Sequence, residues 1–176
     1  MSGNKNYVIF YQNPKIDFLF GIFGGKPIPP KHDQFKPIRV VEIDENGNEK
    51  ILKDFYVKKP GKNAVIEFEE MLKKTASKNF NKENKIKKPN NIEVIISVST
   101  LEKQFKIVDV DNLAKSVLDG LKGVAFDDDS QVSSLIVNKH IHPMKVNALF
   151  VGITKLTEKR LGFGGEIKLF GEKEWN

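Results

Sequence analysis

Residues 92–142 constrain the fold most strongly, because two β-type apolar runs bracket one amphipathic helix in that segment. In residues 92–99, IEVIISVS, every second side chain is apolar, as expected of a strand placed centrally in a sheet. Residues 112–122 repeat apolar side chains at helical spacing and end before Gly123, a common helix stop. Residues 131–142 are again β-type. The segment therefore predicts a strand, a helix and a second strand.

The rest of the chain predicts further strands and one more helix. Two β-type stretches, residues 38–44 and 50–57, flank Asn46-Gly47, a pair favoured in tight hairpin turns. Residues 63–80 again show helical spacing. We also expect strands at 6–11, 147–156 and, more weakly, 166–170, a loop rich in glycine and proline at 21–33, and an extended run at 101–108. Together these elements predict an α+β fold, with a small mixed β-sheet packed with two main helices.

The composition is that of a globular protein with one core. The 176 residues, 39% of them hydrophobic, are enough to bury a sizeable interior. No apolar run approaches the roughly 18 residues of a membrane span, and the start of the chain lacks a signal peptide's apolar region, so we expect a cytoplasmic protein without a membrane partner. The absence of cysteine excludes disulfides, thiolate zinc sites and cysteine nucleophiles. Any metal must be held by oxygen or histidine.

The overall charge indicates a polyanionic partner, yet one segment is strongly acidic. The formal net charge is +6, with a pI near 9.3, and nearly all the basic residues are lysines. Such a charge is typical of proteins that bind nucleic acids. Six aspartates nevertheless fall within a short segment: Asp109, Asp111, Asp119, Asp127, Asp128 and Asp129.

The spacing of these aspartates predicts a cation site. Asp109 and Asp111 are two residues apart, so in an extended segment both side chains project from one face. Asp111 lies where the helix begins, and Lys115 follows one turn later on the same helical face. Residues 127–129 directly precede the next strand. We expect the short helix to return the chain, so that all three acidic positions meet at one edge of the sheet.

Carboxylates gathered in this way require a positive charge. Three of them within about 5 Å would repel by roughly 3 kcal/mol per pair at an effective dielectric constant near 20. Lys115 supplies one charge, whereas Mg²⁺ takes oxygen ligands and commonly bridges carboxylates to a phosphate, and Mn²⁺ would also suit the site. The structural alternative is that Asp111 only caps the helix and residues 127–129 form an acidic turn.

The neighbouring residues argue against two other kinds of acidic site. An EF-hand loop that starts at Asp109 or at Asp127 lacks the glycine needed at its sixth position. A haloacid-dehalogenase-type phosphotransferase also begins with a strand and Asp-x-Asp, but Asn112 and Leu113 depart from its usual pattern.

The order Asp109-x-Asp111-Asn112-Leu113-x-Lys115, then Asp119, then Asp128-Asp129-x-Gln131 resembles the RusA family of Holliday junction resolvases. The resemblance is specific over residues 109–131 and extends less specifically over residues 92–156; before residue 92, only the order strand, loop, helix, strand agrees. It implies a homodimer that acts on branched DNA, the four-way junction. It also implies that Asp109, Asp111, Asp129 and Lys115 are catalytic, and that Asp128 joins the three aspartates as a metal ligand.

The resemblance extends to the domain limits and to the DNA-binding residues. Residues 1–156 would form the nuclease domain, with an enlarged loop and hairpin region at about 12–60, and residues 157–176 a C-terminal extension. Lys103 and Lys106 replace arginines that often precede the family's first aspartate. Together with Lys115 they are the expected nucleic-acid-binding residues.

These observations lead to one main hypothesis and two alternatives. The main hypothesis is a Mg²⁺-dependent, structure-selective endonuclease that resolves four-way junctions by paired symmetric nicks in DNA recombination and repair. An inactive nucleic-acid-binding module would bind junctions without cutting them. A metal-dependent phosphotransferase acting on a small molecule would explain the acids but not the positive charge. We expect His140 and His142 to be surface residues, and we assign no role to Phe20, Phe23 or Trp175.

Overall fold

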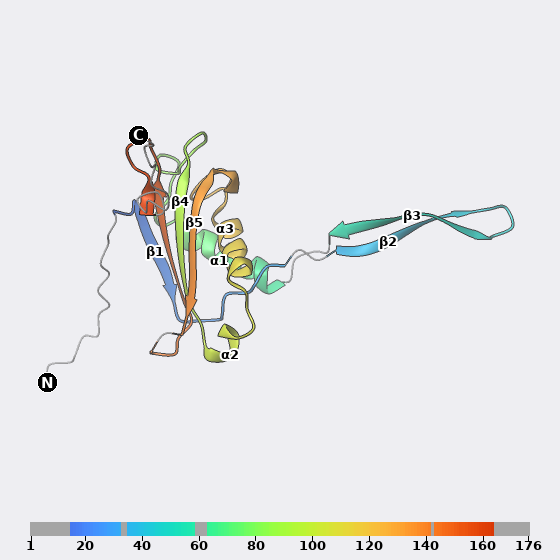
Figure 1. The fold of residues 1–176 in the computed structure, drawn as a ribbon, viewed down its shortest axis with the longest axis horizontal. Helices are drawn as coiled ribbons and strands as arrows, with labels where there is room; N and C mark the ends of the chain where they lie inside the picture. Colours follow the sequence, from blue (N-terminus) through green and yellow to red (C-terminus); the bar gives the residue numbers. More distant parts are fainter. Residues whose placement is uncertain (1–14, 33–34, 59–62, 142, 164–176) are drawn as a thin grey trace, which may run out of the picture.

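The computed structural model describes residues 15–32, 35–58, 63–141 and 143–163, and its elements are shown in Figure 1. The predicted strands at 6–11 and 166–170 lie outside the described residues, as do His142 and Trp175. The strands and helices, in chain order, are β1 (Phe18–Phe23), β2 (Phe35–Ile43), β3 (Glu49–Lys58), α1 (Asn63–Ala76), β4 (Ile92–Ser99), α2 (Glu102–Phe105), α3 (Val110–Leu121), the 3₁₀ turn η1 (Asp129–Gln131), β5 (Val132–His140) and β6 (Ala148–Lys155).

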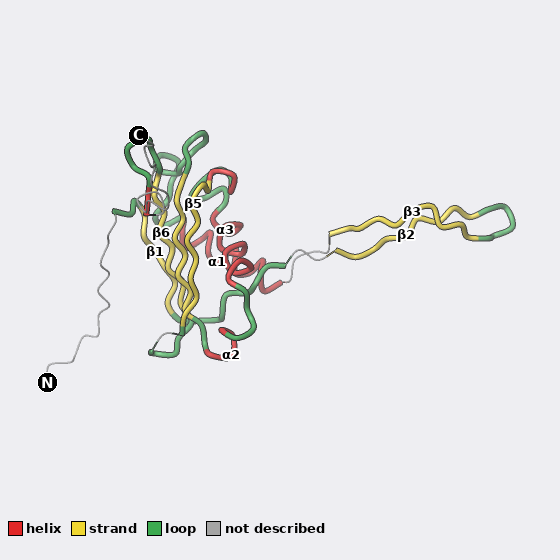
Figure 2. Tube along the Cα trace, in the orientation of Figure 1, coloured by secondary structure: helices red, strands yellow, loops and turns green. Residues whose placement is uncertain are grey.

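The body of the protein is a four-stranded mixed sheet with two main helices on one face (Figure 2). The strand order is β1-β6-β4-β5. β6 is antiparallel to both β1 and β4, whereas β5 is parallel to β4, with Val94 opposite Leu135 and Ile96 opposite Val137. The predicted α+β class, a small mixed sheet packed with two helices, is confirmed. None of the described helices is long and apolar enough to cross a membrane.

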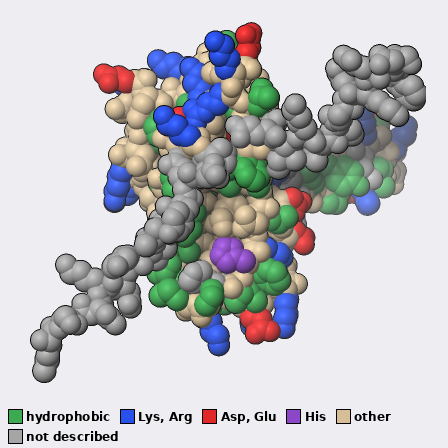
Figure 3. Space-filling view, turned by 60° about the vertical axis from the view of Figure 1, so that its left-hand side comes forward, with side chains coloured by type: hydrophobic (Ala, Val, Ile, Leu, Met, Phe, Trp, Pro, Cys, Tyr) green, Lys and Arg blue, Asp and Glu red, His purple; other side chains and the backbone are tan. Residues whose placement is uncertain are grey.

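The second sheet is a two-stranded ribbon, β2 and β3, that projects from the body as an arm (Figures 1 and 3). The predicted hairpin is confirmed, and its turn is closed by Asp44, whose Oδ1 accepts from the backbone N–H groups of Asn46 and Asn48, each at 2.9 Å. Gly47 has φ +81°, which is why the Asn-Gly pair is found at this turn. Hydrogen bonds from Asn48 to the carboxylate hold the pKa of Asp44 below its usual range.

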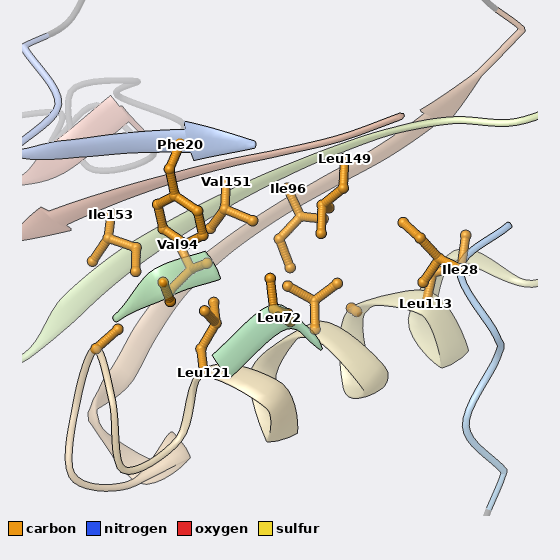
Figure 4. Close-up of a cluster of buried hydrophobic side chains, with 14 of the residues drawn as sticks. Phe20, Ile28, Leu72, Val94, Ile96, Leu113, Leu121, Leu149, Val151 and Ile153 are labelled. Carbon is orange, nitrogen blue, oxygen red and sulfur yellow. The ribbon is translucent and has the colours of Figure 1, made fainter. Parts of the chain in front are cut away.

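The core lies between the sheet and the helices α1 and α3 (Figure 4). Val94 and Ile96 of β4 are fully buried in one cluster with Leu72 of α1 and Leu121 of α3. Gly120 lets the helices approach closely, because a Cβ there would lie 2.9 Å from Cδ2 of Leu72. The apolar periodicity that predicted the helices therefore marks the surfaces that meet in the core.

Three local expectations from the sequence are wrong. The loop predicted from Gly21 begins only after β1, and glycine fits this strand because a Cβ would lie 2.5 Å from the carbonyl oxygen of Leu149. The extended run predicted at 101–108 contains the short helix α2. The helix predicted at 112–122 starts two residues earlier, at Val110, so Asp111 is helical and does not share a β-type face with Asp109.

The segment after β6 contacts the sheet on the side of Glu93. This glutamate is almost fully buried; Oε1 accepts from the backbone N–H of Phe163 at 2.6 Å, and Oε2 accepts from the Ser134 hydroxyl at 2.8 Å. Arg160 also donates to Asp17, just before β1, at 2.6 Å. The first residues of the expected C-terminal extension are thus hydrogen-bonded to β4 and to the residue that precedes β1.

Candidate active site

The first acidic pair lies at the N-terminal end of α3. Asp109 directly precedes the helix with an extended backbone, φ −79° and ψ 143°, and its side chain makes no capping hydrogen bond. Asp111 lies in the first turn, and both residues are exposed. The structural alternative for Asp111 is therefore wrong, because the N-cap position belongs to Asp109. Neither carboxylate is used to cap the helix.

Lys139, at the end of β5, is a cation near this pair that the sequence did not single out. Its ammonium group donates to the carbonyl oxygen of Phe105 at 2.8 Å and to that of Val108, and it lies 4.9 Å from the centre of the Phe105 ring. These contacts fix the turn that leads into Asp109. The parallel pairing of β4 and β5 brings Lys139 to this place, and that pairing could not be read from the lysine's local sequence.

Two further charged residues follow along α3. Lys115 is half-buried, and Asp119 is bound by Lys31 of the N-terminal loop at 2.7 Å. The same lysine binds Glu69 of α1, also at 2.7 Å. Burial acts to lower the pKa of Lys31, but its hydrogen bonds to Asp119 and Glu69 outweigh this and raise the pKa overall. Asp119 thus connects α3 to the loop and to α1.

The N-terminal loop lies along the first half of α3. The backbone N–H of Lys31 donates to the carbonyl oxygen of Asn112 at 3.1 Å, and the Ser116 hydroxyl donates to that of Pro29 at 2.5 Å. Ile28 of the same loop is buried in the core. The glycine- and proline-rich loop therefore supports the helix that carries Asp111 and Lys115.

The second acidic group lies at the opposite end of α3. Lys122, the residue after the helix, binds Asp128 at 2.6 Å and Asp129 at 3.2 Å. These hydrogen bonds raise the pKa of Lys122, and the Lys122 ammonium holds the pKa of Asp128 well below its usual range. Asp127 binds Lys85 at 2.8 Å, which lowers its pKa as well. Each of the three carboxylates has a lysine partner.

Gln131 fixes the shape of this acidic turn. Its buried side chain accepts from the backbone N–H groups of Asp127 at 2.9 Å and Asp128 at 3.0 Å. Its amide donates to the carbonyl oxygens of Ile86 at 3.2 Å and Asn90 at 2.9 Å. Asp128 in turn accepts from the N–H of Ser130, which completes a capping box for η1. The Asp-Asp-x-Gln sequence is thus a structural unit as well as a candidate site.

The structure does not bring the two acidic groups together within one chain. Asp109 and Lys122 flank a helix of 12 residues, which is about 18 Å long at 1.5 Å per residue. Among the residues that the structure describes, no three Asp, Glu or His side chains form a group that could hold a metal ion. The expected meeting at one sheet edge is wrong, because β5 runs parallel to β4 and therefore begins at the far end of α3.

The remaining candidate residues have ordinary positions. Lys103 and Lys106 are exposed on or next to α2, shortly before Asp109 in the chain, and Lys106 is bound to Glu102 at 2.8 Å. His140 is half-buried at the end of β5. Phe20 is a core residue and Phe23 is exposed.

The donor chemistry at both ends of α3 fits a hard divalent cation. Asp109 and Asp111 offer exposed carboxylate oxygens, and Asp129 is exposed beside Asp128. Carboxylate oxygens are ligands that Mg²⁺ and Mn²⁺ prefer. Within one chain, however, these oxygens form two separate groups, one at each end of α3.

A comparison with protein families places the chain in a known family. The model described as Endodeoxyribonuclease RusA matches residues 46–153, which include β3 to β5, most of β6 and both acidic groups. No curated protein matches the chain.

Proposed function

The chain belongs to the RusA family of endodeoxyribonucleases, and we propose that it resolves four-way DNA junctions as a homodimer with divalent-metal-dependent active sites. Two sites related by a two-fold axis would place paired symmetric nicks in opposed strands of a junction. We assign the metal-binding and catalytic roles to Asp109, Asp111 and Asp129, with Asp128 beside them. Mg²⁺ is the proposed ion, with Mn²⁺ as a substitute.

The observation that carries this proposal is the separation of the two acidic groups by the length of α3. Ligand oxygens lie about 2 Å from Mg²⁺, so groups about 18 Å apart cannot hold the same ion. A complete site therefore requires the two ends of α3 to come from different copies. In a two-fold dimer, antiparallel neighbouring helices bring the N-terminal end of one beside the C-terminal end of the other.

Strand β5 offers an edge through which such a dimer can form. It lies at the edge of the four-stranded sheet. α3 runs beside it in the opposite direction, because Lys139 near the end of β5 contacts Val108 shortly before α3, and Lys122 after α3 contacts the turn before β5. Two β5 strands paired antiparallel would continue the sheet. The same pairing would bring Asp109 and Asp111 of one copy toward Asp128 and Asp129 of the other.

Leu135 supports this edge as the interface. It is opposite the fully buried Val94 of β4 and so lies on the face of the sheet that carries the helices. It nevertheless remains 43% exposed, because no further strand or helix of the described chain covers that edge. A second copy would remove this leucine from water.

The residues near the site have separate roles in the proposed reaction. A bound divalent cation would activate water and polarise the scissile phosphate. Lys115, one helical turn after Asp111 on α3, would stabilise negative charge that develops on the phosphate. Lys103 and Lys106 would bind neighbouring backbone phosphates, which gives affinity without reading sequence. Lys139 would hold the backbone before Asp109 in position.

Subunit complementation tests the proposal. Asp111→Asn and Asp129→Asn chains with different affinity tags are produced together, and the mixed dimer is purified and given a labelled four-way junction in Mg²⁺. In a shared site, one of the two sites of the mixed dimer keeps all its carboxylates. We expect single nicks at about half the wild-type rate, and no cutting by either variant alone.

The controls separate the parts of the proposal. Wild-type protein should cut the junction in Mg²⁺ or Mn²⁺, not in EDTA, and should leave a matched linear duplex intact. If the wild type binds the junction but never cuts it, the nuclease function is refuted in favour of an inactive binding module. If the wild type cuts but the mixed dimer does not, the shared site is refuted.

A further inference from the structure

The arm formed by β2 and β3 exposes many large apolar side chains, more than is expected of a ribbon that stays fully solvated. A two-stranded hairpin without a covering layer is at best marginally stable. In this arm, the strands carry large apolar side chains that are 38–72% exposed. They are Phe35, Ile38, Val40, Ile43, Ile51, Leu52, Phe55, Tyr56 and Val57. Such a surface marks an interaction site.

Both faces of the arm are apolar. Paired residues in an antiparallel ribbon point to the same side, so Ile38 and Phe55 share one face, whereas Val41 and Ile51 share the other. A ribbon that lies on its own protein would keep one polar face toward water. Figure 3 shows apolar side chains on the arm where it stands away from the body.

The outer half of the arm, which we call the arm tip (residues 41–52), is acidic. Its charged residues are four carboxylates and one ammonium group, from Glu42, Asp44, Glu45, Glu49 and Lys50. The arm tip therefore has a formal net charge of −3, whereas the whole chain has +6, so the rest of the chain carries a formal net charge of +9. An acidic tip is repelled by DNA phosphates and attracted by a basic protein surface.

We propose that the arm tip docks on the body of a second copy of this chain, in a reciprocal exchange of arms. The partner is another copy because the body offers the complementary chemistry: an apolar recess on a basic molecule. In a two-fold dimer each tip meets the same surface, so both arms are covered at once. This interface goes beyond the nuclease function and does not depend on cutting.

The receiving surface is a cavity of about 320 Å³ between β1, the following loop and α1. Its walls are largely apolar, with Ile22, Ile28 and Phe68 among them. Lys26 lies in its lining with a side chain that is 91% exposed, and its ammonium group is 3.6 Å from the exposed carboxylate of Glu67, which also lines the cavity. A carboxylate of the tip would compete with Glu67 for this lysine. Ile43 and Ile51 of the tip, 64% and 56% exposed, are suited to enter such a recess.

Site-specific crosslinking tests the proposal, and the chain lacks cysteine, so a single one can be introduced. Glu45→Cys carries a benzophenone maleimide, and the protein is irradiated without DNA and with a four-way junction. Mixing ¹⁵N-labelled and unlabelled copies distinguishes crosslinks between chains from those within one chain. We expect a covalent dimer in both samples, with adducts on residues 22–29 or 64–71.

Two comparisons make the result decisive. Glu83→Cys, in the loop after α1, is the matched control and should give no covalent dimer. Adding Ile43→Ser and Ile51→Ser to Glu45→Cys should reduce the dimer yield at least tenfold, whereas Lys36→Ser near the base of the arm should leave it unchanged. Crosslinks to DNA, crosslinks within one chain, or monomer alone would each overturn the proposal, whether or not the protein cuts DNA.

Discussion

Replacing Gln131 with methionine is expected to release the turn that carries Asp128 and Asp129. Methionine has a similar length and fills the same buried space, but it offers no comparable hydrogen-bond donor or acceptor. The substitution removes four hydrogen bonds at once, to the N–H groups of Asp127 and Asp128 and to the carbonyl oxygens of Ile86 and Asn90.

The expected loss in the free energy of unfolding depends on how many of these polar groups water can reach. The bond from Gln131 to Ile86 is buried, whereas the other three are only partly buried. A buried polar group left without a partner costs about 1–3 kcal/mol, and water can replace part of the loss at the other three. We therefore expect the free energy of unfolding to fall by about 2–4 kcal/mol, a large part of the roughly 5–15 kcal/mol of a typical domain.

Urea unfolding followed by far-UV circular dichroism measures this change. The protein concentration must be the same for both proteins, because association contributes to apparent stability. Ser133→Ala, at an exposed position two residues along the chain, is the control and should change stability by less than about 0.5 kcal/mol. A loss below about 1 kcal/mol for Gln131→Met would refute the role of this side chain as the support of the acidic turn.

Three further predictions concern the two ends of α3 and its contact with α1. The pKa of Asp128 is lowered from 3.8, so its contribution to stability is present at neutral pH and is lost as the pH falls through its folded pKa. The difference in urea midpoint between wild type and Asp128→Asn should therefore shrink between pH 6 and pH 3. A constant difference would contradict this. Gly120→Val should cost about 1–3 kcal/mol in thermal or urea unfolding by overpacking against Leu72, and an unchanged melting temperature would show that the helices can move apart. Lys139→Met should accelerate hydrogen exchange at residues 106–111 and slow junction cutting by about tenfold or more. Unchanged exchange would show that the turn before Asp109 keeps its conformation without the Lys139 hydrogen bonds.

Local patterns predicted the elements whose own side chains determine their conformation. The alternation in residues 92–99 gave β4, the apolar spacing gave the central parts of α1 and α3, and Asn46-Gly47 gave the turn of the arm. β1 was missed because Gly21 suits a strand only where the chain of β6 passes close to it, a contact with residues about 130 positions away. α2 was missed because the apolar residues near it also fit an extended run.

The candidate site shows the same division between local and distant information. The motif identifies the family and selects Asp109, Asp111 and Asp129 as residues to test. Their placement depends on the direction of β5, which is set by its parallel pairing with β4 and not by the aspartates themselves. Lys139 was missed for the same reason, since its contacts with Phe105 and Val108 exist only in the folded sheet.

The position of β6 between β1 and β4 determines when the sheet can be completed during synthesis. β1 leaves the ribosome long before its partner residues, 148–153, are made. The arm and the α1 helix can form much earlier, because their contacts are local. Until β6 emerges, β1 lacks its partner strand and β4 has one open edge. A chain interrupted before residue 148 would therefore expose two template strands to aggregation.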